Sequence, residues 1–90
     1  MRFKYDKAKS ARLKRTRGLG FEEVQAIWSS PYYVDQRTEV PEQWRAIGWV
    51  GGRLYSVIFE EREDTLGEYV HLVTLWRATK AEEQLYAQNS

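Results

Sequence analysis

The sequence predicts an α+β domain in which a small antiparallel sheet of three to four strands is flanked by two N-terminal helices and a C-terminal helix. Two helix-like segments lie before residue 31, three strand-like segments follow between residues 43 and 76, and a helix-capping pair comes after them. Consecutive strands with short turns form an antiparallel meander. Helices that flank the strands in sequence, and do not alternate with them, are typical of α+β domains.

The two N-terminal helices are predicted from capping residues and apolar spacing. Asp6 can cap a first helix over residues 7–15, and the glycines on either side of Leu19 end it. A second helix starts at Phe21, and its apolar side chains recur at helical spacing (Phe21, Val24, Ile27 and Trp28). Pro31 and the two serines before it end this helix.

The strands and the last helix are predicted after residue 31. The strand signals cover residues 43–50, 53–61 and 69–76, with Gly51-Gly52 as a hairpin turn and residues 62–68 as a second turn. Residues 3–5 are a short extended start, and residues 32–42 are a loop or a short strand. Thr79 and Glu82 have the spacing of a capping box, which predicts a helix over about residues 80–87.

Composition limits the class of protein. Residues 1–90 form a single domain, and 42% hydrophobic with 14% aromatic residues exclude a disordered chain. The absence of cysteine excludes disulfides, thiolate zinc sites and a cysteine nucleophile. No apolar run approaches the roughly 18 residues of a membrane span, and the basic N-terminus lacks the apolar core of a signal peptide. We therefore expect a cytoplasmic location and no membrane partner.

The charges are divided unevenly along the chain. Residues 1–17 hold eight Lys or Arg and one acid, a net charge of +7, whereas the other 73 residues carry a net charge of −6. This asymmetry indicates a polyanion or an acidic partner near the N-terminus, although a solvated helix face would give the same pattern.

The sequence shows no metal or cofactor site. His71 is the single histidine, and no cluster of His, Asp and Glu has the spacing of metal ligands. The glycine pairs are too sparse to form a phosphate-binding loop. We therefore expect neither a metal nor a cofactor.

His71 is the main candidate for acid–base chemistry. It lies in the middle of an apolar strand segment, where alternation places it on one face with Tyr69, Val73 and Leu75. An imidazole titrates near neutral pH, which suits a general acid or base. The alternative is a structural histidine that is packed or hydrogen-bonded in the fold.

Arginines and aromatic residues give two further signals. Arg53, Arg62 and Arg77 fall at strand ends or just beyond them, where guanidinium groups can bind phosphate bidentately. Four Trp and six Tyr are more than a small core needs. Exposed rings beside cations either stack single-stranded bases or form protein interfaces, and sequence does not separate the two.

Four groups of residues occur in order along nearly the whole chain. They are Phe3-x-x-Asp6-x-x-Lys9 with Gly18 and Phe21-Glu22-Glu23; Ser30-Pro31; Ile47-Gly48 with Gly52-Arg53-Leu54, Val57-Ile58-Phe59 and Glu61-Arg62; and Arg77-Ala78-Thr79 with Glu82 and Tyr86. Together they resemble the pattern of the BrnT toxins of bacterial toxin–antitoxin pairs.

The resemblance implies a fold like that of the RelE ribonuclease toxins and a metal-independent endoribonuclease activity. It also implies a cognate, BrnA-like antitoxin that neutralises the toxin, with a hetero-oligomer of the two as the expected assembly. In such enzymes a 2′-hydroxyl attacks the adjacent phosphate, a base takes its proton, and cations stabilise the transition state.

The candidate site residues follow from the resemblance together with His71. The positions that match the family pattern are Lys9, Arg53, Glu61, Arg62 and Arg77, and Glu61 is the best retained carboxylate for a general base. The candidate catalytic residues are His71, Glu61, Arg53, Arg62 and Arg77. The candidate RNA-binding residues are Lys9, Arg12, Arg17 and Arg45.

The chain also departs from the family pattern. Thr16-Arg17-Gly18 stands where the family has Lys-His-Gly, and His71 and Trp76 stand where it has arginines. Either His71 has taken over the acid–base work, or the domain binds RNA or an antitoxin without cleavage. A third hypothesis is a structural or regulatory protein whose charges and aromatic residues describe only a protein interface.

Overall fold

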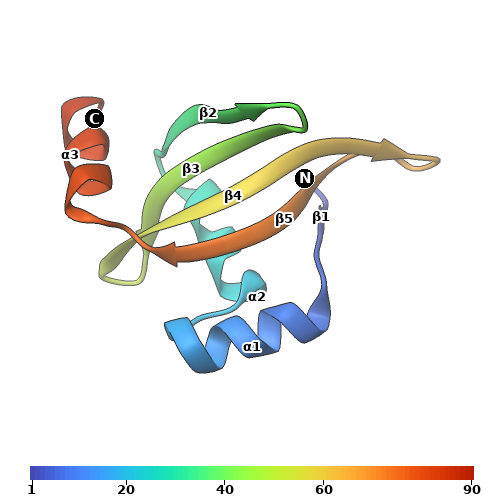
Figure 1. Cartoon of the computed structure of the whole chain (residues 1–90), viewed down its shortest axis with the longest axis horizontal. Helices are drawn as coiled ribbons and strands as arrows, with labels where there is room; N and C mark the ends of the chain where they lie inside the picture. Colours follow the sequence, from blue (N-terminus) through green and yellow to red (C-terminus); the bar gives the residue numbers. More distant parts are fainter.

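The computed structural model describes all 90 residues. In chain order the elements are β1 (Phe3–Lys4), α1 (Lys7–Arg17), α2 (Phe21–Val24), the 3-10 helix η1 (Gln25–Ser29), β2 (Tyr33–Glu39), β3 (Glu42–Val50), β4 (Arg53–Asp64), β5 (Gly67–Arg77) and α3 (Lys80–Gln88). Strands β2 to β5 follow one another without an intervening helix, which confirms the α+β class (Figure 1). Helices packed against a sheet are the architecture that the family resemblance implied, and a closer likeness to the RelE toxins stays a prediction.

All five strands form one sheet in the order β1-β5-β4-β3-β2. Strands β2 to β5 pair antiparallel, as predicted for a meander, whereas β1 pairs parallel with β5. The prediction of a purely antiparallel sheet of three to four strands is therefore wrong. Two residues of β1 are too few to show a period, and β2 is mostly polar because it is an exposed edge strand.

The helix ends match their capping signals. The Asp6 carboxylate accepts a hydrogen bond from the backbone N–H of Lys9, and Gly18 ends α1 in the left-handed conformation. The second predicted helix is shorter than expected, since one α-helical turn from Phe21 gives way to the 3-10 helix η1. Such turns are common at the C-terminal ends of α-helices.

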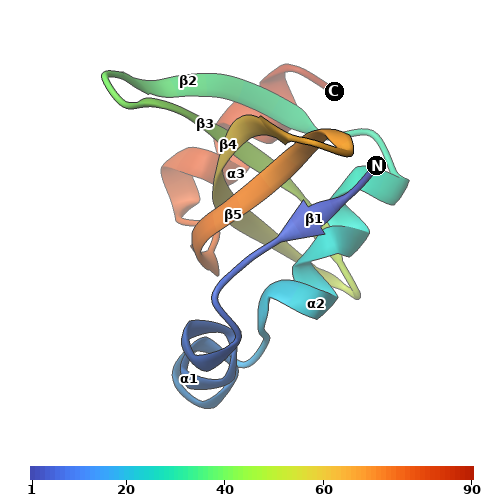
Figure 2. The same cartoon turned by 90° about the vertical axis from the view of Figure 1, so that its right-hand side faces the viewer.

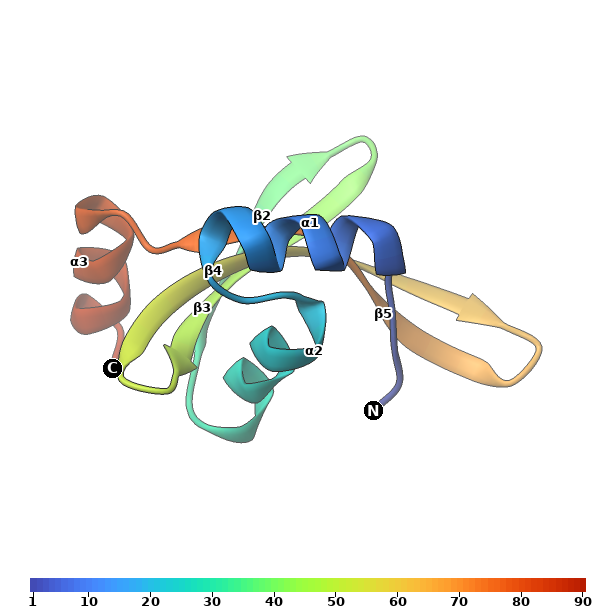
Figure 3. The same cartoon turned by 90° about the horizontal axis from the view of Figure 1, so that it is seen from below.

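The core lies between one face of the sheet and the helices α1, α2 and η1 (Figure 3). Its buried residues are Leu13, Leu19, Phe21, Val24 and Ile27 from the helical segment and Ala46, Tyr55, Val57, Phe59, Val70, Leu72 and Leu75 from the strands. These strand residues alternate with residues that face the other way, so they mark the helix-covered face of the sheet.

The opposite face is covered at one end only. Helix α3 lies across it beside the end of β5 (Figure 2). The hydroxyl of Tyr86 on this helix donates to the carbonyl of Pro31. The polar residues farther along this face have no helix over them. We call this region, which includes Gln43, Glu60, His71 and Trp76, the open face.

The hairpin of β4 and β5 projects beyond the other strands (Figure 3). The predicted turn over residues 62–68 is shorter in the structure, because β4 continues to Asp64 and β5 begins at Gly67. The N-terminus is tied to this hairpin through Asp64, which accepts bonds from Arg2 (2.8 Å) and Lys4 (2.6 Å). The Arg2 guanidinium and the Lys4 ammonium hold the pKa of Asp64 well below its usual range.

Candidate active site

His71 lies on the open face in the middle of β5. Its Cα partners are Lys4 on β1 and Glu60 on β4, so a cation and a carboxylate flank it across the sheet. Side chains directly opposite each other on adjacent strands have Cβ atoms roughly 4.5–5.5 Å apart. The histidine is therefore next to charged groups and not inside the apolar core.

The carboxylate of Glu60 is fixed by two neighbours. Gln43 donates its side-chain amide to one oxygen at 2.7 Å, and Arg62 donates its Nε to the other at 2.9 Å. The hydrogen bond from Gln43 lowers the pKa of Glu60 most, and the Arg62 guanidinium lowers it further against the opposing effect of burial. Glu60 is therefore a charged, oriented group beside the imidazole.

The surroundings of His71 favour its neutral form. Partial burial lowers the pKa of the imidazole most, the Arg62 cation lowers it further, and Lys9 adds to this, while Glu60 acts in the opposite direction. The net result is a pKa below the ordinary value of 6.5. A neutral imidazole at physiological pH can accept a proton, as a general base must.

A β-bulge determines which residues share the face of His71. The pairing of β4 with β5 shifts between Ile58 and Phe59, which leaves Val73 without a cross-strand partner. Beyond the bulge Leu75 is fully buried in the core, and Trp76 lies on the open face. The prediction that His71 shares a face with Leu75 is therefore wrong, because simple alternation does not allow for an extra residue.

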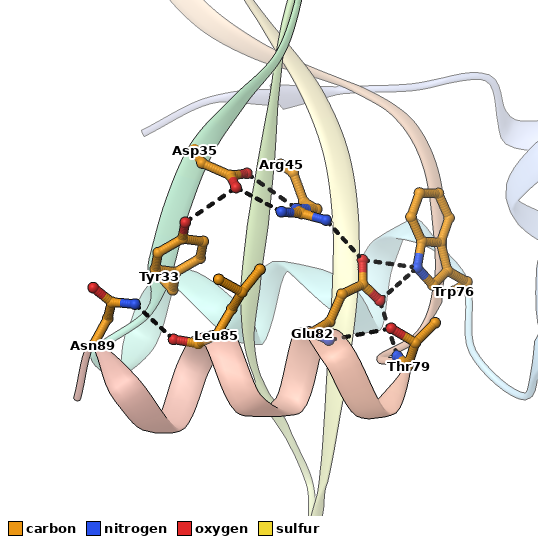
Figure 4. Close-up of polar contacts among 8 residues, drawn as sticks. All are labelled: Tyr33, Asp35, Arg45, Trp76, Thr79, Glu82, Leu85 and Asn89. Carbon is orange, nitrogen blue, oxygen red and sulfur yellow. Dashed lines mark hydrogen bonds and ion pairs between the residues drawn. The ribbon is translucent and has the colours of Figure 1, made fainter.

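The end of the open face beside α3 is organised by Glu82 (Figure 4). This buried carboxylate accepts the indole N–H of Trp76 at 2.9 Å and the backbone N–H of Thr79 at 2.9 Å, and it pairs with Arg45 at 3.3 Å. Burial would raise the pKa of Glu82, but these bonds bring it below its ordinary value. The indole of Trp76 is thus held in a fixed orientation.

Arg45 is occupied by two carboxylates. It donates its Nε to Asp35 at 3.0 Å as well as pairing with Glu82, and its side chain is only 25% exposed (Figure 4). A guanidinium already neutralised in this way is poorly suited to bind phosphate. The assignment of Arg45 to RNA stays a prediction, and these ion pairs disfavour it.

A cavity of about 320 Å³ opens next to this network. Its lining residues are Asp35, Gln36, Arg37, Arg45, Ile58 and Trp76. The guanidinium of Arg37 lies 5.3 Å from the centroid of the Trp76 ring, a cation–π contact. This cavity therefore offers the fixed ring of Trp76 beside Arg37, an arginine that has no carboxylate partner in the structure.

The predicted catalytic residues do not all meet at one place. Arg62 joins His71 on the open face, but Glu61 points to the helix-covered face, since it follows Phe59 at a spacing of two. Arg53 and Arg77 lie exposed at the far end of the sheet, and eight residues of strand put Arg53 roughly 26 Å from Glu61. The five residues thus fall into three regions.

The sequence interpretation missed Glu60, which lies next to His71. The signal that points to it is alternation, because Glu61 shares a face with the apolar residues of β4 and its neighbour Glu60 must then face the other way. The family pattern directed attention to Glu61 instead.

The basic residues of α1 divide in a similar way. Lys9 is half-buried and near enough to His71 to lower its pKa. Arg12 and Arg17 are exposed and form no ion pair. Gly18 lies close to the Tyr55 hydroxyl, so Arg17 is at the same end of the sheet as Arg53 and Arg77.

Comparison with known protein families identifies the chain. A family model described as the ribonuclease toxin BrnT of type II toxin–antitoxin systems matches residues 5–82. The chain belongs to the BrnT family. The resemblance found in the sequence is therefore confirmed. Membership assigns to the chain the general activity of a ribonuclease toxin and a protein antitoxin as partner. No curated protein matches the chain.

Two structural findings accompany this BrnT assignment. The structure has no group of three or more His, Cys, Asp or Glu side chains that could hold a metal ion. None of its helices is long and apolar enough to cross a membrane.

Proposed function

We propose that this BrnT-family protein is a metal-independent endoribonuclease toxin whose reaction takes place on the open face of the sheet. The observation that supports this site best is the position of His71. The imidazole lies half-buried beside an oriented carboxylate, Glu60, and a guanidinium, Arg62, on a face that no helix covers. These are the side chains that RNA cleavage through the 2′-hydroxyl requires.

In the proposed reaction, neutral His71 removes the proton of a ribose 2′-hydroxyl. The 2′-oxygen bonds to the adjacent phosphorus, the bond from phosphorus to the 5′-oxygen breaks, and the leaving oxygen takes up a proton from solvent. The products are a 2′,3′-cyclic phosphate and a 5′-hydroxyl. Arg62 and Lys9 stabilise the negative charge that develops on the phosphoryl oxygens.

Glu60 has a supporting role in this proposal. Its carboxylate favours the imidazolium that forms when His71 accepts the proton, and its bonds with Gln43 and Arg62 keep it charged and fixed. Trp76 and Arg37 supply a stacking surface for a base farther along the strand, because aromatic faces and guanidinium planes bind unpaired bases. Arg12, Arg17, Arg53 and Arg77 would attract the RNA backbone from outside this face.

The proposed partner is a BrnA-like antitoxin that neutralises the toxin as a hetero-oligomer, and the proposed place of action is the cytoplasm. A type II antitoxin is a protein, which agrees with the family assignment. The alternative proposal is a domain that binds RNA or its antitoxin without cleavage. It is favoured by Thr16-Arg17-Gly18, since the histidine of the family pattern is missing there.

The chemistry is tested with two RNA oligonucleotides that differ by one oxygen. Purified protein in EDTA should cleave an all-ribose oligonucleotide and leave a 2′,3′-cyclic phosphate, which mass spectrometry detects. The matched oligonucleotide with a 2′-deoxyribose at the cleaved position should stay intact there. Cleavage at the deoxy position would contradict the mechanism, and binding without any cleavage would support the alternative.

A further inference from the structure

An apolar groove lies on the helix-covered face, beyond the edge of η1. Its volume is about 280 Å³, and seven of its eight lining residues are hydrophobic, among them Trp28, Tyr32, Val34, Trp44 and Phe59. Tyr32 and Val34 remain 40% and 46% exposed, although the neighbouring helices bury most of this face. Apolar grooves of this kind on small proteins mark interaction sites.

The aromatic walls of the groove are held in place by one another. The Trp28 ring lies 5.8 Å from the Tyr32 ring and 5.3 Å from the Phe59 ring, measured between centroids. Such contacts fix side chains that would otherwise lose conformational entropy when a partner binds. Exposed Trp and Tyr are also the residues that contribute most to protein interfaces.

The groove continues into an acidic cavity of about 660 Å³ under the β4–β5 hairpin. The two cavities share Met1, Glu61 and Val70, and the second adds Glu63 and Glu68. Glu63 and Glu68 are Cα partners on adjacent strands, an unfavourable pairing of like charges. We call the two cavities together the trough.

The acids of the trough are not neutralised within the chain. Glu61, Glu63 and Glu68 form no ion pair. The two arginines of the acidic cavity are already engaged, Arg2 with Asp64 and Arg62 with Glu60. The trough therefore presents a row of aromatic rings followed by glutamates that form no ion pair.

This arrangement defines the chemistry of a binding partner. Apolar side chains would fill the aromatic end, and Lys or Arg would face the glutamates. RNA does not fit, because its phosphates would be repelled by the acids. A second copy of this chain fits poorly, since its cationic helix α1 exposes Lys, Arg, Ala and Thr but no large apolar side chain.

We propose that the trough is the docking surface for a cationic amphipathic segment of the antitoxin. Glu63 follows Phe59 by four positions on β4, so their Cα atoms are roughly 13 Å apart, which about two and a half turns of helix would span. The proposal rests on the pairing of this toxin with an antitoxin, but not on the cleavage mechanism. His71 lies on the other face of the sheet, so antitoxin binding and cleavage are separable by mutation.

The test uses the purified cognate antitoxin protein as the probe. Val34→Glu places a charge at the aromatic end, and the double variant Glu63→Lys, Glu68→Lys reverses the acidic end. Each should weaken antitoxin binding, measured by calorimetry, on the order of tenfold or more. RNA cleavage by the free variants should be unchanged.

Matched controls carry the same changes elsewhere. Val40→Glu lies in the exposed β2–β3 turn, and Glu39→Lys with Glu83→Lys reverses two exposed acids outside the trough. These variants should bind the antitoxin like wild type. The double lysine variant exchanges one like-charge pair for another at two exposed positions, so it should be as stable as wild type, which urea denaturation checks.

Three results would overturn the proposal. Wild-type affinity in both trough variants would show that the antitoxin docks elsewhere, and loss of affinity in a His71 variant alone would place it on the open face. A wild-type dimer that Val34→Glu makes monomeric would show that a second copy occupies the trough. Wild-type protein that binds the antitoxin but cleaves no RNA would contradict the proposed function and leave the trough proposal standing.

Discussion

At the scale of single residues, the account depends on a histidine that is kept neutral among charged groups. His71 loses solvent on the sheet and faces Arg62 and Lys9, and both effects disfavour a second positive charge. The Glu60 carboxylate raises the pKa of His71, but the net pKa still lies below its ordinary value. The imidazole is therefore mostly neutral near neutral pH and can accept a proton. A histidine surrounded by carboxylates would be protonated more often, so less of it would be free to act as a base.

This environment predicts how cleavage depends on pH. The pKa of His71 lies below 6.5, so the neutral base is the major form at neutrality and its fraction rises as pH increases. The rate measured between about pH 5 and pH 8 should rise with pH, with a midpoint below 6.5, and then level off. A rate that falls over this range would require a protonated His71 and would contradict its role as the base.

Glu82 is the residue that holds the end of the open face together. Its buried carboxylate joins α3, Trp76 and Arg45, so Glu82→Ala leaves a half-buried guanidinium short of one partner. We expect a loss of about 3 kcal/mol in the free energy of unfolding, measured with urea. Glu83→Ala, in the next and exposed position, should change it by less than about 0.5 kcal/mol. Equal midpoints for the two variants would contradict the role of Glu82.

Single residues also show where sequence reasoning succeeds and where it stops. His71 was identified because it is the single histidine and lies in a strand segment. Glu60 was missed, since the family pattern directed attention to Glu61 and the choice between the two depends on which face of β4 the helices cover. The bulge at Val73 cannot be read from the sequence because an extra residue in a strand leaves the composition unchanged.

At the scale of elements, helix η1 is fixed to the sheet through a glycine. A Cβ at Gly48 on β3 would lie 2.8 Å from Cγ2 of Ile27 and 3.3 Å from Cβ of Tyr32. The absence of a side chain at this position lets η1 approach the strand closely. The same contact places Tyr32 and Trp28 beside the trough.

Gly48→Ala should therefore destabilise the fold by about 1–3 kcal/mol, because Ile27 is fully buried and cannot move aside. Gly52→Ala is the matched control, since a Cβ there meets nothing within 4 Å. Urea denaturation of both variants measures the difference. A Gly48→Ala variant as stable as the control would contradict the close packing of η1 on β3.

Elements with strong local signals were predicted well. Asp6 and the pair Thr79 and Glu82 form the caps that their spacing indicates, and Gly51-Gly52 forms the predicted hairpin. The sequence predicts only a short extended start where β1 lies and a loop or short strand where β2 lies. Strand β1 is too short to show a pattern, and β2 is solvated on both faces. Strand β1 is fixed by pairing with β5, far along the chain, and β2 by its hairpin with β3, so neither depends on an alternating pattern of its own.

At the scale of the whole molecule, charge divides the surface into parts with different partners. The basic N-terminal segment suits a polyanion, and the glutamates of the β4–β5 hairpin suit a cationic protein segment. The uneven distribution of charge along the sequence predicts part of this separation. The placement of His71 and the trough on opposite faces depends on strand register and was not predictable from the sequence.

The role of the N-terminal cations predicts a change in salt dependence. If Arg12 and Arg17 contact RNA phosphates, replacing both with Gln should reduce the slope of log affinity against log salt by about 1.4 for single-stranded RNA. Binding is measured in the His71→Ala background to avoid cleavage. Lys80→Gln, an exposed cation on α3, is the control and should leave the slope unchanged.

The central claim is that this BrnT-family toxin cleaves RNA with His71 as the base. The most direct measurement is the initial rate of RNA cleavage in EDTA for wild type, His71→Ala and Glu61→Ala, each checked for folding. The account predicts a rate about 100-fold or more below wild type for His71→Ala and near wild type for Glu61→Ala. A fully active His71→Ala protein, or loss of activity in Glu61→Ala alone, would contradict it and move the site to the other face of the sheet.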